Sequence, residues 1–172
     1  MITEIGIENF KVFCERKTFK LSNLNIFAGV NGRGKSTVFQ SLLMLSQSII
    51  KNGTVDELSI NGSYVNLSQF EDVLCSYGTD DTIRFSFMTD ESECRKLNLG
   101  YKRKGPWKGK ICELKINEKD YFSRNRDLIG GKAGDEPVLQ AYRKDDVTKL
   151  FSNFYYISAS RLGPTLYEEN KE

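Results

Sequence analysis

Histidine is absent from this sequence of 172 residues. A histidine-based catalytic triad, a histidine metal site and a histidine general base are therefore all excluded. The cysteines are few and scattered, without the CxxC pairs that would favour a zinc site. Because no secretion signal precedes them, we expect reduced thiols in a cytoplasmic protein at Cys14, Cys75, Cys94 and Cys112.

Long apolar runs are missing as well. No stretch approaches the roughly 20 apolar residues that span a bilayer. The opening residues, MITEIGIENFKVF, lack the basic region and apolar block of a signal peptide. A hydrophobic share of 39% and a charged share of 28% are normal for a soluble globular protein. The length suits one ordinary domain with a real core.

Charge is unevenly placed, although the net charge is only +2. Residues 51–90 hold two basic and seven acidic side chains, whereas residues 91–126 hold eleven basic and five acidic ones. The stretch 101–110, YKRKGPWKGK, combines five basic residues with Tyr101 and Trp107. Such a stretch could follow a nucleic-acid backbone. The alternative, which we favour, is a hairpin tip kept soluble by its lysines.

The chemistry of this sequence lies in a phosphate-binding loop. Residues 29–37 read GVNGRGKST and fit the pattern G-x-x-x-x-G-K-[ST], with Gly29, Gly34, Lys35 and Ser36 in the defining positions. The glycines let the backbone turn tightly, so that successive N–H groups point at phosphate oxygens. The helix that follows adds its positive N-terminal dipole.

Side chains of the loop complete this site. Lys35 places a point charge between the outer phosphates, and the Ser36 hydroxyl can ligate Mg²⁺. Thr37 is expected to reach the inner phosphate. Arg33 lies inside the loop, and we expect its side chain to point to solvent or to a partner rather than to act as an arginine finger.

The elements around the loop can be placed from hydrophobic periodicity. Alternating apolar residues predict short strands at residues 3–10 and 17–21, and the nearly continuous apolar run at 24–28 predicts a strand buried on both faces. An apolar stripe predicts a helix over residues 36–50, stopped by Asn52 and Gly53. This context of buried strand, loop and helix supports phosphate binding.

From about residue 55 to residue 122 the period changes to two, which predicts an antiparallel meander with a short helix near 69–75. Residues 128–137 are expected to form a loop, 145–153 a short helix and 154–158 a strand that rejoins the sheet. The polar end, YEENKE, is expected to fray. No guanine-reading N-K-x-D-like motif occurs, which favours ATP over GTP.

Three stretches together resemble the ABC-type ATPases of the SMC, RecF and OLD-like group. They are IENFKVF at 7–13, LNIFAGVNGRGKSTVFQSLLML at 24–45 and YYISASRLGP at 155–164. The last one is similar to bacterial AAA-family proteins, several of which serve in phage defence. The resemblance implies an α/β fold, a P-loop NTPase of ABC-ATPase type with a partial sheet and an antiparallel β-subdomain. It divides the chain into a P-loop core (1–54), that subdomain (55–126) and a returning segment (127–172).

The resemblance also implies the residues of the site. Catalytic roles would fall to Lys35 and, as a Q-loop glutamine that touches Mg²⁺, to Gln69; a helix-capping role for Gln69 is the alternative. Gln40 is expected to pack against its neighbours, and Arg161 could pair with a carboxylate, face a partner or cap the sheet. The metal ligands would be Ser36 and Gln69, and the cofactors ATP and Mg²⁺. The implied nucleotide contacts are Asn31, Gly32, Arg33, Gly34, Lys35, Ser36, Thr37 and Lys11.

The sequence departs from this family in lacking an LSGGQ-like signature and a convincing Walker B motif. The nearest candidate, residues 83–91, makes Asp90 and Glu91 poor choices for metal ligand and base, because strict alternation suits a half-exposed strand. We therefore expect the N-terminal half of an ATPase head that binds ATP but needs a missing C-terminal half or a homodimer partner for hydrolysis, in DNA transactions or phage defence. The alternatives are a self-contained small P-loop NTPase or kinase and a non-catalytic interaction module.

Overall fold

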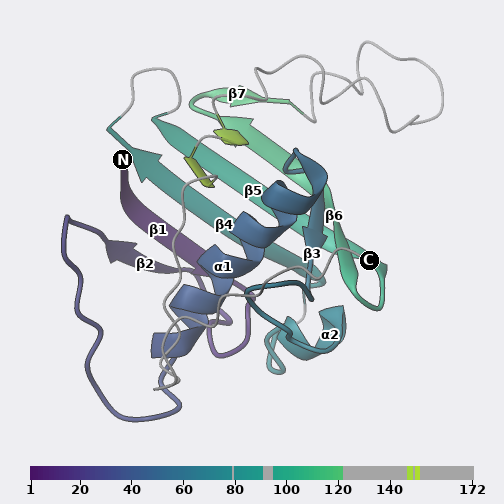
Figure 1. Cartoon of the computed structure of the whole chain (residues 1–172), viewed down its shortest axis with the longest axis horizontal. Helices are drawn as coiled ribbons and strands as arrows, with labels where there is room; N and C mark the ends of the chain where they lie inside the picture. Colours follow the sequence, from purple (N-terminus) through teal and green to yellow (C-terminus); the bar gives the residue numbers. More distant parts are fainter. Residues whose placement is uncertain (79, 91–94, 122–146, 149, 152–172) are drawn as a thin grey trace, which may run out of the picture.

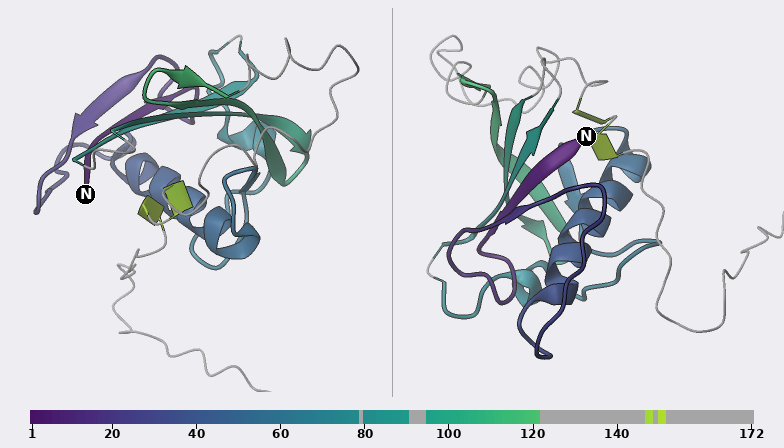
Figure 2. Two further views of the ribbon diagram at one scale, coloured as in Figure 1. Left: turned by 90° about the horizontal axis from the view of Figure 1, so that it is seen from above. Right: turned by 90° about the vertical axis from the view of Figure 1, so that its left-hand side faces the viewer.

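One antiparallel sheet and one long helix packed across it make up the fold (Figure 1). The computed structural model describes residues 1–78, 80–90, 95–121, 147–148 and 150–151. Seven strands form the sheet, and Figure 2 shows helix α1 along one of its faces. The elements are β1 (Ile2–Glu8), β2 (Lys17–Lys20), α1 (Lys35–Asn52), β3 (Glu57–Ser59), α2 (Phe70–Val73), β4 (Thr82–Thr89), β5 (Lys96–Gly105), β6 (Lys108–Ile116) and β7 (Lys119–Asp120).

Strand order in the sheet is β2-β1-β4-β5-β6-β3, with β7 on β6, and every pairing is antiparallel. The meander predicted from residue 55 onward is therefore confirmed, as are the strands expected near 3–10 and 17–21. Strand β1 lies between β2 and β4, with Ile7 opposite Phe85. Residues 1–54 and 55–126 thus contribute strands to the same sheet.

Alternation along the strands builds the core. Ile83, Phe85 and Phe87 of β4 are buried, whereas Arg84 is only partly buried. Successive strand residues point to opposite faces of a sheet, so β4 turns its aromatic side chains toward α1 and its arginine away. The helix supplies the opposing apolar side chains, among them Val38, Met44, Leu45 and Ile49.

Helix α1 begins after Gly34 and ends at Gly53, which confirms the predicted helix and its stop signal. Gly53 has a left-handed φ of 68°, and its N–H donates to the Ile49 carbonyl over 2.7 Å. This termination is the one that glycine favours, because it lacks a Cβ. No helix in the described part of the chain is long and apolar enough to cross a membrane.

Buried polar side chains of α1 fasten neighbouring segments. The Gln47 amide donates to the Ser59 carbonyl over 3.0 Å, and its oxygen accepts from the Tyr64 and Val65 N–H groups. The Ser46 hydroxyl donates to the Phe151 carbonyl over 2.9 Å. Buried polar groups with partners of this kind fix geometry at little cost.

The apolar run at 24–28 is not a strand, which corrects the sequence prediction. Leu24 and Ile26 are 76% and 84% exposed. Ser22 and Asn25 instead form a local turn, in which the Asn25 amide donates to the Ser22 carbonyl over 2.7 Å. An apolar run becomes a buried strand only where neighbouring strands receive it, and no described strand pairs with this one.

Two of the cysteines are joined, which corrects the expectation of four reduced thiols. Cys14 and Cys75 form a disulfide with a Cα–Cα separation of 5.1 Å, across 61 positions in the sequence. Tertiary structure brings the turn after β1 against the segment after α2, and no local spacing announces such a pair. Cys112 is free and half-buried, and Cys94 lies outside the described residues.

The remaining predicted elements divide between described and undescribed residues. Helix α2 confirms the short helix expected near 69–75. Residues 147–148 and 150–151 are helical, in agreement with the helix expected at 145–153, and Val147 and Phe151 are buried. The loop at 128–137, the strand at 154–158, Arg161 and the polar end lie outside the described residues.

Replacement of Phe151 by alanine should destabilise the fold. Phe151 is fully buried and meets Phe87 edge-on, with ring centroids 5.0 Å apart. Truncating a buried phenylalanine costs about 3–5 kcal/mol, measured as the free energy of unfolding in urea. Phe39→Ala is the matched control, because Phe39 is 47% exposed. An equal loss in both variants would contradict a core role for Phe151.

Candidate functional site

The loop 29–37 follows the exposed apolar segment 24–28 and runs into the first turn of α1, which begins at Lys35. All three of its glycines have left-handed φ values: 139° at Gly29, 78° at Gly32 and 92° at Gly34. Residues with a Cβ rarely adopt these angles. The glycines that the motif prescribes at positions 29 and 34 therefore meet a conformational need of this backbone.

Gly34 is also required by a close approach of the turn after β1. A Cβ built on Gly34 would lie 2.5 Å from the Phe13 ring and 2.9 Å from a Val12 methyl carbon. The turn itself is tight, because Phe10 and Phe13 exchange backbone hydrogen bonds of 3.0 Å. The sequence stretch IENFKVF thus acts as a wall behind the loop, a role that motif reasoning had not assigned to Val12 or Phe13.

Lys35 closes the loop on itself. Its ammonium group donates to the carbonyls of Gly29 and Val30, each over 2.7 Å. Asn31, Gly32, Arg33 and Ser36 are exposed, as their expected contacts with a ligand require, whereas Thr37 is only 6% exposed.

The first turn of α1 carries a positive electrostatic potential, and no side chain of that turn neutralises it. No side chain caps the helix start at Gly34, and no acidic residue lies in the first turn. The first N–H groups of a helix have no intrahelical acceptor and, with the helix dipole, attract anions. Together with Lys35, these groups form a site with the chemistry of phosphate binding.

Lys11 lies in the wall beside the helix. Its ammonium group donates to the Gln40 side-chain oxygen over 2.8 Å, and its backbone N–H donates to the Val73 carbonyl over 2.8 Å. Partial burial lowers the pKa of Lys11. Lys11 therefore contacts α1 about one helical turn after the loop. Gln40 packs against a neighbour, as expected.

A line of aromatic rings holds the segment before the loop on the rest of the protein. Phe27 meets Phe19 of β2 with ring centroids 6.2 Å apart and Phe39 of α1 at 5.1 Å, and Phe19 meets Phe13 at 5.6 Å. Contacts at these separations are favourable edge or offset arrangements. The loop therefore has anchored residues on both sides, although the segment before it is not in the sheet.

Gln69 has a local structural role. It is the N-cap of α2: the Asp72 carboxylate accepts from the Gln69 N–H over 3.0 Å, as in a capping box, and the Asp72 N–H donates to the Gln69 backbone carbonyl over 3.1 Å. This arrangement favours the helix-capping interpretation over a metal-binding one. Asp90 forms an ion pair with the Met1 amino group, and Glu91 lies outside the described residues.

The basic hairpin tip is neutralised within the protein. Lys104 and Lys108 both pair with Glu57, the second over 2.8 Å. Arg103 pairs with Glu71, and Lys102 pairs with Asp81 over 3.1 Å. The basic stretch after residue 90 thus faces the acidic one before it, which supports the solvated hairpin over a nucleic-acid site at residues 101–110.

Comparison with known proteins identifies the family of this site. The AAA ATPase domain model matches residues 1–161. The DNA replication and repair proteins RecF of Thermoanaerobacter sp. (strain X514) and of Thermoanaerobacter pseudethanolicus (strain ATCC 33223 / 39E) are each 25% identical over 99 residues. The match covers 56% of this chain and 26% of each relative, so the chain spans about a quarter of their length.

Gly34→Ala should unfold the protein more readily than Gly32→Ala. Both positions have a left-handed φ, but a Cβ at Gly32 meets nothing within 4 Å, whereas one at Gly34 meets the Phe13 ring. The overpacking should add about 1–3 kcal/mol to the loss of unfolding free energy, measured by urea denaturation. Equal losses would mean that backbone strain alone makes glycine necessary at position 34.

Glu57→Gln should remove part of the acid sensitivity of folding. The hydrogen bonds from Lys104 and then Lys108 lower the pKa of Glu57 to about 2. A carboxyl whose pKa is lowered by folding contributes stability above its unfolded pKa near 4.5, and this contribution is lost as the pH falls toward 2. Urea unfolding between these pH values should show a shallower decline in the variant. Glu118→Gln is the control, because exposed Glu118 has no ion pair among the described residues; an identical change there would refute the assignment.

Proposed function

This chain belongs to the family of AAA ATPase domains, and on that basis we propose that its loop 29–37 binds the phosphates of ATP together with Mg²⁺. The observation that carries the proposal is the loop at the uncapped start of α1, closed around the Lys35 ammonium group. Phosphate oxygens would replace the carbonyls of Gly29 and Val30 as acceptors for Lys35. The exposed hydroxyl of Ser36 would be a ligand of Mg²⁺.

Hydrolysis needs more than this loop. Phosphoryl transfer requires the metal, a positioned water and stabilisation of the developing charge at the same time. Among the described residues, Gln69 caps α2 and Asp90 pairs with the amino terminus. We therefore assign ATP binding to this chain, and we assign hydrolysis to its assembly with further residues.

The exposed apolar segment at residues 24–28 supports the proposal that a partner binds beside the loop. Leu24 and Ile26 are exposed, and the backbone groups of residues 26–28 have no hydrogen-bond partner in the described part of the chain. Unpaired strand-like backbone next to apolar side chains is a template for an added strand. The proposed occupant is the C-terminal half of an ABC-type head of the SMC and OLD-like group or a homodimer partner, and its strand would place residues 24–28 inside a larger sheet.

The relatives are named for DNA replication and repair, and their similarity supports a role in DNA transactions. We extend that role to this chain as part of the proposal, with phage defence as a second setting and the cytoplasm as the location. For the alternative of a self-contained kinase or NTPase, no acidic residue in the described part of the chain lies in a suitable place to support catalysis. A nucleotide-dependent interaction module is compatible with the exposed segment, and turnover measurements separate it from an ATPase.

Calorimetric titration with ATP and Mg²⁺ tests the binding proposal. The full chain should bind ATP, and Lys35→Ala should weaken binding at least tenfold, because it removes the charge that faces the phosphates. Lys51→Ala is the matched control, since Lys51 is an exposed lysine in the last turn of the same helix and makes no ion pair among the described residues; its affinity should stay within threefold. Identical affinities for the parent chain and Lys35→Ala would falsify the assignment.

The same preparations should show no steady ATP turnover without a partner. Turnover by the full chain that Lys35→Ala abolishes would instead establish a self-contained enzyme. A change from monomer to dimer in light scattering on ATP addition would identify the partner as a second copy.

A further inference from the structure

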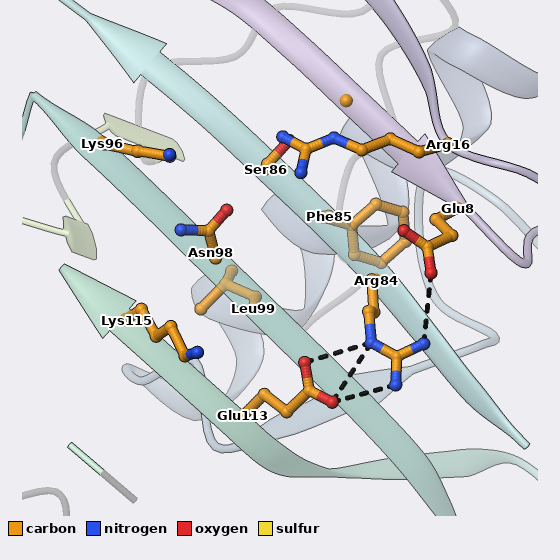
Figure 3. Close-up of a pocket in the computed structure, with 11 residues that line it drawn as sticks. Glu8, Arg16, Arg84, Phe85, Ser86, Lys96, Asn98, Leu99, Glu113 and Lys115 are labelled. Carbon is orange, nitrogen blue, oxygen red and sulfur yellow. Dashed lines mark hydrogen bonds and ion pairs between the residues drawn. The ribbon is translucent and has the colours of Figure 1, made fainter. Parts of the chain in front are cut away.

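A groove crosses the face of the sheet that α1 does not cover (Figure 3). Its volume is about 300 Å³, and strands β1, β4, β5 and β6 supply most of its lining. Because alternate residues of β4 point to opposite faces, Arg84 and Ser86 lie in this groove while Phe87 packs in the core. The groove is therefore separate from the phosphate loop at the start of α1.

One end of the groove is acidic and fully paired. Arg84 donates to both carboxylate oxygens of Glu113 over 3.0–3.1 Å and to Glu8 over 3.3 Å, as Figure 3 shows. Its guanidinium also pairs with Asp80. Three carboxylates thus surround one arginine, and this end has no donor to spare for an anion.

The other end is basic and carries donors. Arg16, from the turn between β1 and β2, lies across Gly6 and donates to the Ser86 hydroxyl over 2.7 Å. A Cβ on Gly6 would clash with the Ser86 Oγ atom and lie 3.2 Å from the Arg16 Nε atom, so the glycine makes room for both side chains on the sheet. Ser86 itself is 8% exposed, and its hydroxyl is held in place.

Lys96, Asn98 and Lys115 extend this end over β5 and β6 (Figure 3). Neither the Lys96 ammonium group nor the half-buried Asn98 amide has a side-chain partner among the described residues, and Lys115 has only Asp120 at 3.4 Å. By contrast, Lys104 and Lys108 on the same two strands share Glu57. Among the described residues, the groove thus holds one lysine on β5 without an ion pair and one lysine on β6 with a longer pair.

The polar groups form one row across the strands. Gly6 faces Ser86, Ser86 faces Asn98, and Asn98 faces Lys115 in the strand register. Three strand spacings of about 4.8 Å give the row a length of roughly 14 Å, which exceeds a single phosphate group. The row suits an extended chain of phosphates better than one small anion.

We propose that this groove binds the phosphate backbone of a nucleic-acid strand through Arg16, Ser86, Lys96, Asn98 and Lys115. Arginine, lysine, serine and asparagine side chains are the usual donors to backbone phosphates, and such contacts carry no base specificity. This inference rests on the proposed role in DNA transactions, and it does not depend on ATP binding. An acidic peptide is the competing ligand for a basic surface.

Fluorescence anisotropy of a labelled 20-nucleotide oligothymidylate, titrated with the full chain at several salt concentrations, tests the proposal. Lys96→Ala combined with Lys115→Ala should weaken binding at least tenfold and reduce the slope of log K against log salt by about 1.4, since each single-strand phosphate contact contributes about 0.7. Lys104→Ala combined with Lys108→Ala is the matched control, because it also removes one lysine from β5 and one from β6. Its affinity should stay within twofold.

Several outcomes would overturn the groove assignment. These are an equal loss in both double variants, no binding by the parent chain, or displacement of the oligonucleotide by polyglutamate at equal charge. Thermal melting of each variant confirms that it is folded. ATP calorimetry on the groove variant should give the parent affinity. If the chain binds DNA but not ATP, the groove assignment stands and the proposed function is wrong. If it binds ATP but not DNA, the proposed function stands and the groove assignment is wrong.

Discussion

The contact between the Phe13 ring and the backbone of Gly34 sets the position of the phosphate loop. Phe13 is held by the tight turn after β1 and by Phe19, so it moves with the sheet. Gly34 begins α1, so it moves with the helix. A Cβ at position 34 would clash with the Phe13 ring and the Val12 methyl carbon. The loop is therefore positioned by both layers of the fold, even though the segment before it is not a strand and contacts the layers through the Phe27 ring.

Sequence reasoning succeeded where a pattern depends on local periodicity. The apolar stripe of α1, its glycine stop and the period-two strands all follow from rules that act within one element. The apolar run at 24–28 failed because burial needs neighbouring strands, and a run cannot show whether they are present. The Cys14–Cys75 pair and the wall made by Val12 and Phe13 were missed for the same reason, since both depend on segments that meet only in three dimensions.

The distribution of charge on the sheet also depends on contacts that the sequence does not show. The most basic stretch of the sequence, residues 101–110, is largely neutralised by Glu57, Glu71 and Asp81. The lysines that line the groove, Lys96 and Lys115, stand apart in the sequence and would attract no notice there. Strand pairing brings them to the same groove, so the electrostatic character of a sheet face is a property of the pairing and only indirectly of composition.

The central place of β1 in the sheet has a consequence for the order of folding. Ile7 pairs with Phe85, which is 78 positions later in the chain. At about 5–20 residues per second, a ribosome needs roughly 4–16 s to make that interval. Contacts between such distant residues also form slowly, because a long loop must close first. The residues of the wall are made before the loop, but β1 gains its second neighbour, β4, only after this interval, so a nascent chain carries its most recognisable motif well before the sheet behind that motif is complete.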